Sequence, residues 1–145
     1  MIRRFALLLS SITLLIPVSS FTAPQSQPQQ SAAQPQLPLS KDPQKQREFD
    51  ETRANILMAR KQYSEAIPIY LRLVQQEKDL RRKALLYNRI GIAYQQQGMF
   101  DPARRNYDRA VKADRTNASA TNNLGTVHYQ NKRYKKAIQS YKKAL

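Results

Sequence analysis

A repeat of 34 residues constrains the fold of this chain more than any other feature. Aligning residues 84–111 with residues 118–145 gives seven identities in 28 positions, whereas about two are expected by chance at ordinary residue frequencies. The identical pairs are Ala84/Ala118, Asn88/Asn122, Gly91/Gly125, Gln96/Gln130, Ala103/Ala137, Tyr107/Tyr141 and Ala110/Ala144. A weaker third copy lies upstream at an offset of 37 residues, and its matching residues are Tyr63, Ala66, Tyr70 and Leu73. Three copies are the smallest number expected to form a stable stack.

Helical spacing explains where the small and apolar residues fall within each copy. Gly91 and Gly125 recur at one phase of the repeat, and glycine inside a helix costs about 1 kcal/mol relative to alanine. Their recurrence therefore predicts close contact with a paired helix, whereas Gly98 is predicted to end a helix. Helix starts are predicted at Asp42-Pro43, Ser64-Glu65 and Asp101-Pro102, because these residues favour N-caps and first turns. Helices are predicted near residues 43–61, 64–79, 82–97, 101–113, 118–131 and 134–145.

The pattern resembles the tetratricopeptide repeat (TPR), which places an apolar and a small residue, then an aromatic, on its first helix and alanine, aromatic, alanine on its second. The residues that carry the resemblance are Ile90, Gly91, Tyr94, Ala103, Tyr107 and Ala110, followed by Leu124, Gly125, His128, Ala137, Tyr141 and Ala144. Tyr87 and Thr121 stand where the family often has Trp, and His128 replaces an aromatic residue. The resemblance implies an all-α solenoid of about three helix-turn-helix repeats in residues 42–145. The repeats would span about 47–83, 84–117 and 118–145.

The first 41 residues are predicted to lie outside this domain. Two arginines precede an apolar stretch of 14 residues, Phe5 to Val18, and two serines follow it, which is typical of a secretory signal peptide over residues 1–20. An uncleaved membrane anchor is the alternative. Residues 21–41 are rich in Gln, Pro, Ser and Ala, a composition that predicts a disordered linker. The protein is therefore expected to be exported, to the periplasm or the exterior.

Composition argues against an enzyme. The chain has no cysteine, so it has no thiolate nucleophile and no Cys-ligated zinc. Its single histidine, His128, cannot form a His-rich metal site, and its three glycines are too scattered for a phosphate-binding loop. We therefore predict no catalytic residues, no metal site and no cofactor. At its position in the repeat, His128 is expected to be a packed core side chain.

The resemblance implies that the first helix of each pair lines a concave groove, which in the family holds extended peptides or partner helices. Asn and Gln side chains both donate and accept hydrogen bonds, so they could bind a peptide backbone without fixing its sequence. The alternative is that they are ordinary exposed polar positions. A clamp for a C-terminal carboxylate is not expected, because Glu51 and Ser119 stand where cations are needed. The predicted partner-binding residues are Asn55, Asn88, Ile92, Gln95, Asn122, Asn123, Thr126 and Tyr129.

Basic residues concentrate on the second helices, which face outward in the family. The chain carries a net charge of +15, and such a surface attracts anionic lipid headgroups or acidic proteins. The alternative is a face that serves solubility. Nucleic acid is not expected as the partner, because an exported protein seldom meets it and no aromatic platform accompanies the charges. The predicted anion-binding residues are Arg104, Arg105, Arg109, Lys132, Arg133, Lys135 and Lys136.

The two ends of the stack are expected to differ. Asp50 and Arg53 replace apolar residues on the first helix, so its outer face is expected to meet water as a cap. The last helix carries an apolar stripe of Ile138, Tyr141, Ala144 and Leu145. Such a stripe usually marks an interface. Self-association, docking of a partner helix and continuation of the natural chain are the three interpretations.

Two functions follow as hypotheses. The first is a scaffold or adaptor without enzymatic activity, which binds another protein or peptide through its groove at the cell envelope. The alternative is a basic module whose convex helices bind an anionic membrane surface or a polyanion. Binding to a polyanion should weaken steeply with ionic strength, whereas binding in an amide-lined groove should depend on it much less.

Overall fold

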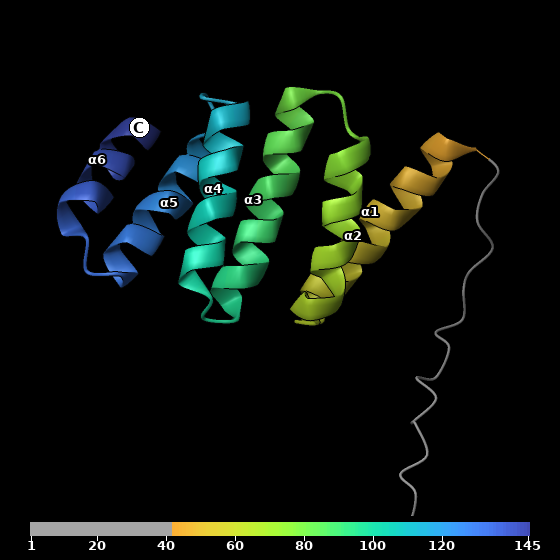
Figure 1. Cartoon of the computed structure of the whole chain (residues 1–145), viewed down its shortest axis with the longest axis horizontal. Coiled ribbons are helices and arrows are strands. Elements are labelled where there is room, and N and C mark those ends of the chain that lie inside the picture. The colour runs from red at the N-terminus through yellow and green to blue at the C-terminus, as the bar shows by residue number, and fades with distance from the viewer. Residues whose placement is uncertain (1–41) are drawn as a thin grey trace, which may run out of the picture. The chain divides into compact units, whose positions relative to one another are not determined.

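The computed structural model describes residues 42–145, which form six α-helices and no strand. The helices follow one another as a stack in chain order (Figure 1). Each predicted helix is present, and its bounds differ from the prediction by at most three residues. The predicted signal peptide and linker lie outside the described residues. The helices are α1 (Pro43–Ala59), α2 (Tyr63–Gln76), α3 (Leu80–Gln96), α4 (Phe100–Ala113), α5 (Ala118–Gln130) and α6 (Tyr134–Ala144).

The first helix of each pair begins with a side-chain cap. Asp42, Asp79 and Asn117 accept hydrogen bonds from the backbone N–H groups at the starts of α1, α3 and α5, at 2.8–2.9 Å. These bonds satisfy N–H groups that have no partner inside the helix. The prediction at Asp42 is thus confirmed.

The second helices begin differently, and two predicted starts are wrong. The N-caps of α2, α4 and α6 are Gln62, Met99 and Arg133, none of which makes a side-chain cap bond. Asp101 lies inside the first turn of α4 instead of capping it, and α2 begins one residue before Ser64. The chain turns into these helices through a left-handed residue two positions before Tyr63, Phe100 and Tyr134; the three residues are Lys61, Gly98 and Lys132.

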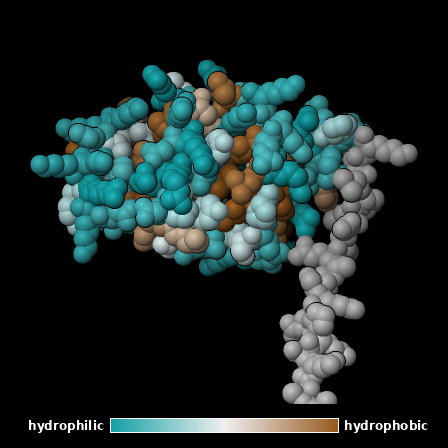
Figure 2. All heavy atoms as spheres, viewed as in Figure 1, coloured by the Kyte–Doolittle hydropathy of each residue, from teal (hydrophilic) through white to brown (hydrophobic). Residues whose placement is uncertain are grey.

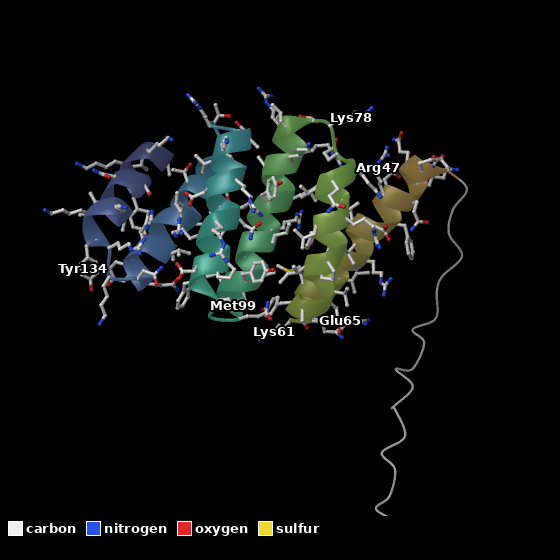
Figure 3. The ribbon with its side chains drawn as sticks, viewed as in Figure 1. Arg47, Lys61, Glu65, Lys78, Met99 and Tyr134 are labelled. Carbon is white, nitrogen blue, oxygen red and sulfur yellow. The ribbon has the colours of Figure 1, made fainter. Side chains whose placement is uncertain are left out.

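The helices form three pairs, α1–α2, α3–α4 and α5–α6. The helices of each pair contact each other, α2 contacts α3, α4 contacts α5, and α3 also contacts α5. Lys61 and Met99, in the turns within the first two pairs, lie at one edge of the stack, whereas Lys78, between pairs, lies at the opposite edge (Figure 3). On the face seen in Figure 2, hydrophobic residues gather near α2 and α3, and hydrophilic residues cover the end near α6. Because α3 contacts α5, the first helices of the second and third pairs lie next to each other.

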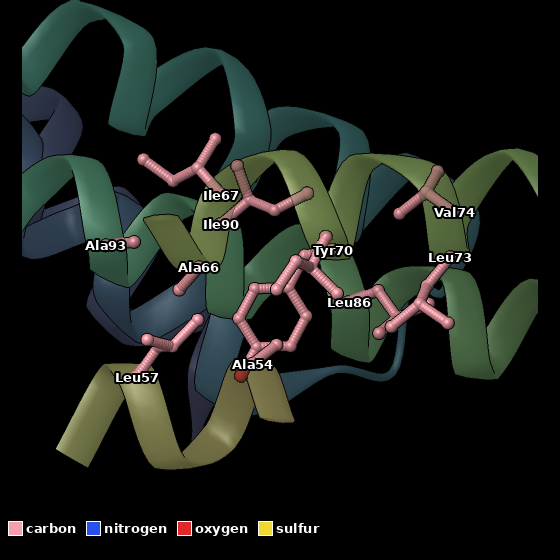
Figure 4. Close-up of a cluster of buried hydrophobic side chains, with 11 residues drawn as sticks. Ala54, Leu57, Ala66, Ile67, Tyr70, Leu73, Val74, Leu86, Ile90 and Ala93 are labelled. Carbon is pink, nitrogen blue, oxygen red and sulfur yellow. The ribbon is translucent and has the colours of Figure 1, made fainter. Parts of the chain in front are cut away.

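The largest hydrophobic cluster lies among α1, α2 and α3. Tyr70 is fully buried in it, with its ring pointing toward Ala54 of α1 (Figure 4). A smaller cluster of Ala103, Tyr107 and Val127 joins α3, α4 and α5. On α6, Ala137 alone is buried. The core thus becomes thinner toward the last helix.

Close contact at the repeated glycines is confirmed. A Cβ atom added at Gly91 would stand 2.5 Å from Cε1 of Tyr107, and one added at Gly125 would stand 2.7 Å from Cε1 of Tyr141. Ala54 occupies the equivalent position in the first pair and lies against Tyr70. A small residue on the first helix thus makes room for a tyrosine ring of the second helix.

Candidate protein-binding face

The predicted groove residues lie on one side of the first helices, which we call the A face. It comprises the exposed side of α3 and the equivalent sides of α1 and α5. Its residues on α3 are Leu85, Asn88, Arg89, Ile92, Gln95 and Gln96. Of the predicted residues, Asn55, Ile92, Gln95, Asn123 and Thr126 are half-buried, Asn122 and Tyr129 are exposed, and Asn88 is buried at 8% exposure.

Tyrosine hydroxyl groups from the second helices reach several of these side chains. Tyr70 donates to Oδ1 of Asn55 at 2.6 Å, and Tyr141 donates to Oγ1 of Thr126 at 3.3 Å. In the middle pair the equivalent residue is Ile92, which cannot accept a hydrogen bond, and Tyr107 donates to Oε1 of Gln95 at 2.7 Å instead. The repeated tyrosines of the second helices could have predicted these hydrogen bonds, because a buried tyrosine hydroxyl usually requires a partner.

A second set of hydrogen bonds ties the first helices to one another. Arg89 on α3 donates to Oδ1 of Asn55 on α1 at 2.8 Å. Asn123 on α5 donates to Oδ1 of Asn88 on α3 at 3.0 Å, and Ser119 lies 3.5 Å from Nδ2 of Asn88. Several amides expected to bind a ligand therefore hold the A face together. Burial raises the pKa of Tyr70, and the nearby Arg89 guanidinium partly opposes that rise.

The A face also presents side chains that the six described helices leave exposed. Leu85 is 55% exposed and Tyr129 is 60% exposed, and the Tyr129 ring meets Tyr134 edge to face with centroids 5.5 Å apart. Asn122 and Gln96, on the same face, are also exposed. The face therefore combines apolar and aromatic anchors with amides on a preformed frame.

The cationic side chains predicted on the second helices fall into two groups. Arg104 lies 2.9 Å from the Asp108 carboxylate, and the Arg109 guanidinium lies 5.9 Å from the centroid of the Tyr87 ring. These two cations therefore have partners within the chain. The remaining members are exposed: Arg105, Lys132, Arg133, Lys135 and Lys136.

Charge is distributed unevenly along the stack. All ten Asp and Glu residues of the chain lie between Asp42 and Asp114. From Arg115 to the last residue the chain carries no Asp or Glu but seven Lys and Arg residues: Arg115, Lys132, Arg133, Lys135, Lys136, Lys142 and Lys143. The last helix pair is therefore the most cationic part of the molecule.

Neither a metal centre nor a membrane span is found in the described part of the chain. Residues 42–145 contain no group of three or more His, Asp or Glu side chains placed to hold a metal ion. None of the six helices is both long and apolar enough to cross a bilayer.

Comparison with known protein families gives one consistent result. Two family models, both described as tetratricopeptide repeat, match residues 49–116 and residues 88–145. Together they cover residues 49–145. No curated protein sequence matches the chain.

Solved structures share the same fold. The TPR domain of Sgt2 from Aspergillus fumigatus has a TM-score of 0.63 at 24% identity, over 73% of this chain and 67% of that one. The second TPR domain of Spaghetti (RPAP3), bound to the HSP90 peptide SRMEEVD, has a TM-score of 0.61 at 21% identity, over 68% and 89%. MamA has a TM-score of 0.62 at 18% identity, and the match covers 68% of this chain and 56% of that one.

Proposed function

Because residues 49–145 belong to the tetratricopeptide-repeat family, we propose that this protein is a scaffold or adaptor without enzymatic activity that binds a segment of another protein on its A face. The observation that carries the proposal is the exposure of Leu85 and Tyr129 on α3 and α5. Tyrosine is enriched among the residues that supply most of the binding energy in protein interfaces, and an exposed leucine adds apolar area that a partner can bury. The hydrogen bonds of Asn55 with Arg89 and of Asn88 with Asn123 hold the A face in one conformation, which lowers the entropy lost on binding.

The solved relatives support a peptide as the ligand. The Spaghetti domain holds an acidic peptide of HSP90, and its fold matches this chain over most of its length. The carboxylate clamp is not part of the proposal, because Asn55 and Arg89 bond to each other at 2.8 Å. Glu51 would also repel a terminal carboxylate. The ligand proposed here is an internal extended segment or a helix.

The proposal also includes export of the protein to the cell envelope. The leader-like residues 1–20 and the Gln/Pro-rich residues 21–41 support action at the cell envelope, with the TPR domain held away from the membrane or the wall. Sequencing the N-terminus of protein from the native cells is the test. A start near Phe21 supports export with cleavage, whereas an intact Met1 supports an uncleaved anchor.

Partner capture tests the use of the A face. The full chain carrying Leu85→Ala with Tyr129→Ala should retain at most a tenth of the partner captured from an envelope extract, because truncation of two interface anchors costs at least about 1 kcal/mol each. Leu71→Ala, on α2, is the matched control and should capture normally. Equal capture by the double variant and the wild type would exclude the A face as the site.

One observation favours the alternative function, binding of an anionic surface by the second helices. The absence of Asp and Glu after Asp114 favours attraction of the last helix pair to an anionic membrane surface or a polyanion. In that case Lys135→Glu with Lys136→Glu should abolish capture and binding should fall steeply with salt. Under the A-face proposal, that variant captures its partner normally.

A further inference from the structure

One pair of repeat positions is filled in three different ways. The first member of the pair lies on the first helix and is Asp50, Tyr87 or Thr121. The second member lies on the second helix and is a cation in every repeat. The three cations are Arg72, Arg109 and Lys143.

The first two repeats give the cation a partner from within the chain. In the first repeat, the buried carboxylate of Asp50 lies 3.3 Å from the Arg72 guanidinium. In the second, the Arg109 guanidinium lies over the Tyr87 ring, 5.9 Å from its centroid, at a distance where a cation is attracted to an aromatic face. An anion and an aromatic ring therefore both serve at this position.

The third repeat supplies neither group. Thr121 is too short to reach Lys143 as a ring would, and the third repeat contains no Asp or Glu. A recess of about 250 Å³ opens here between α4, α5 and α6. Val111 and Leu124 give it an apolar wall, and Lys136 and Lys143 bring two positive charges to it.

His128 is one of the residues that line this recess. It occupies the repeat position of Tyr94, whose larger side chain packs against the cores on both sides of α3. His128 is 9% exposed, and its Nδ1 atom is buried without a hydrogen-bond partner among residues 42–145. Burial lowers its pKa, an effect that Lys136, Arg133 and Arg104 reinforce and Asp108 opposes. The lowered pKa favours the uncharged ring, whose Nδ1 is a buried polar atom.

We propose that the recess between α4, α5 and α6 binds one aromatic ring that carries a carboxylate. The ring would fill the space that Tyr87 occupies in the preceding repeat, against Val111 and Leu124. The carboxylate would take the place of Asp50 beside Lys136 and Lys143. The volume is below the range typical of drug-sized ligands, so it suits a single ring. Thr121, Leu124 and His128 lie on a different side of α5 from the A face, so the inference is independent of the proposed function.

Titration of the full chain by NMR is the first test. The probe is 3-phenylpropionate, which should shift the amide signals of Thr121, Leu124 and His128 and saturate. Propionate, which lacks the ring, and 3-phenyl-1-propanol, which lacks the charge, should each bind at least tenfold more weakly. Equal binding of propionate, or no saturable shift with any probe, overturns the proposal.

Two variants locate the site. Thr121→Tyr restores the residue of the preceding repeat, so it should raise the melting temperature and reduce affinity for 3-phenylpropionate at least tenfold. Thr126→Tyr, on the A face, is the matched control and should keep the affinity. Lys136→Gln with Lys143→Gln should remove the preference for the acid over the alcohol. Unchanged affinity in Thr121→Tyr, or an unchanged preference in the lysine variant, overturns the proposal.

A second probe distinguishes two natural sources of the aromatic acid, the C-terminal end of a protein and a free small acid. A tripeptide Gly-Gly-Phe with a free carboxyl end presents the same ring and acid on a peptide chain. Tenfold tighter binding of this peptide than of 3-phenylpropionate assigns the recess to the end of a protein, and the reverse assigns it to a free small acid. If neither probe binds more tightly than propionate, the recess is not a site for this chemistry.

Discussion

Equivalent residues of the first four helices and of the last pair have different surroundings. Tyr70 and Tyr107 are fully buried, whereas Tyr141 at the same repeat position is half-buried. Asn88 is buried beneath α5, whereas its counterpart Asn122 is exposed. The comparison shows that burial within a repeat depends on the helix that follows it as much as on its own sequence.

Residues on the outer face of α1 are likewise more exposed than their counterparts on α3. Phe49 and Ile56 are exposed, although their counterparts Leu86 and Ala93 are buried by the preceding helix pair. The predicted polar cap at this end is therefore wrong in detail, and Asp50 is buried in its pair with Arg72 instead of meeting water. Apolar residues thus remain uncovered on the outer face of the first helix of the stack.

The last pair exposes its apolar stripe as well. Ile138 is 54% exposed, and a recess of about 500 Å³ lies beside Asn122, Tyr141 and Leu145. The self-association predicted through this helix stays a prediction.

The largest difference between the two regions is expected from truncating the repeated tyrosine. Tyr107→Ala should destabilise the protein by about 3–5 kcal/mol, because it empties a fully buried site. Tyr141→Ala should cost only about 1–2 kcal/mol, since its ring is half-buried. Urea unfolding followed by circular dichroism measures both, and equal losses would show that the last pair is packed as tightly as the middle one.

The glycine contacts should give a smaller difference of the same sign. Gly91→Ala forces a methyl group against the ring of buried Tyr107, so it should destabilise by about 2–3 kcal/mol. At Gly125 the half-buried Tyr141 can move aside, and alanine gains about 1 kcal/mol in helix propensity. Gly125→Ala should therefore change the free energy of unfolding by less than about 1 kcal/mol. A larger loss at Gly125 than at Gly91 in thermal unfolding would contradict the comparison.

Replacing the two equivalent asparagines, Asn88 and Asn122, should also change the free energy of unfolding by different amounts. Asn88→Ala removes the acceptor for Asn123 in a buried site, which should cost about 1–2 kcal/mol. Asn122→Ala removes an exposed side chain and should stay within about 0.5 kcal/mol of the wild type. Chemical denaturation of each single variant is the measurement. If Asn122→Ala were the more damaging change, Asn122 would be held by contacts that the described helices do not supply.

Glycine at the left-handed lysines should change stability equally in the two regions, so it gives the smallest difference between them. Lys61 and Lys132 have φ angles of 61° and 58°, and left-handed backbone is unfavourable for a residue with a side chain. Lys61→Gly and Lys132→Gly should each stabilise by about 0.5–1 kcal/mol, after the entropy cost of glycine. Differential scanning calorimetry would detect the rise in melting temperature. A gain at one site alone would mean that the turns are not equivalent.

Periodicity was sufficient to predict the helices and their pairing. The 34-residue spacing places alanine, glycine and tyrosine in register, and each residue type has one role in every repeat. The starts of α2 and α4 could not be predicted in the same way. α2 follows the left-handed residue Lys61 and α4 follows the left-handed residue Gly98. Lysine carries no signal for that conformation, and Gly98 was predicted only to end the preceding helix.

The sequence predicted which residues share the A face, but not how they bond to one another. The spacing located Asn55, Asn88 and Asn123 on the A face, but a single sequence does not reveal whether an amide faces a ligand or a neighbouring helix. That distinction depends on long-range pairs such as Arg89 with Asn55. Thr121 and His128 are smaller than the tyrosines at the same positions of the preceding repeat, and this difference is visible in the sequence. That Lys136 and Lys143 line the recess beside them depends on how α4, α5 and α6 pack.

Site-specific photo-crosslinking in the cells that make the protein tests the central claim, that a partner protein binds the A face. A photoreactive benzoylphenylalanine would replace Gln96 or Tyr129 on the A face, and Arg105 or Lys135 on the second helices as controls. We predict that one protein is cross-linked, and can be identified by mass spectrometry, from both A-face positions and from neither control. Adducts formed from Arg105 and Lys135 alone, whether with protein or with lipid, would contradict the claim.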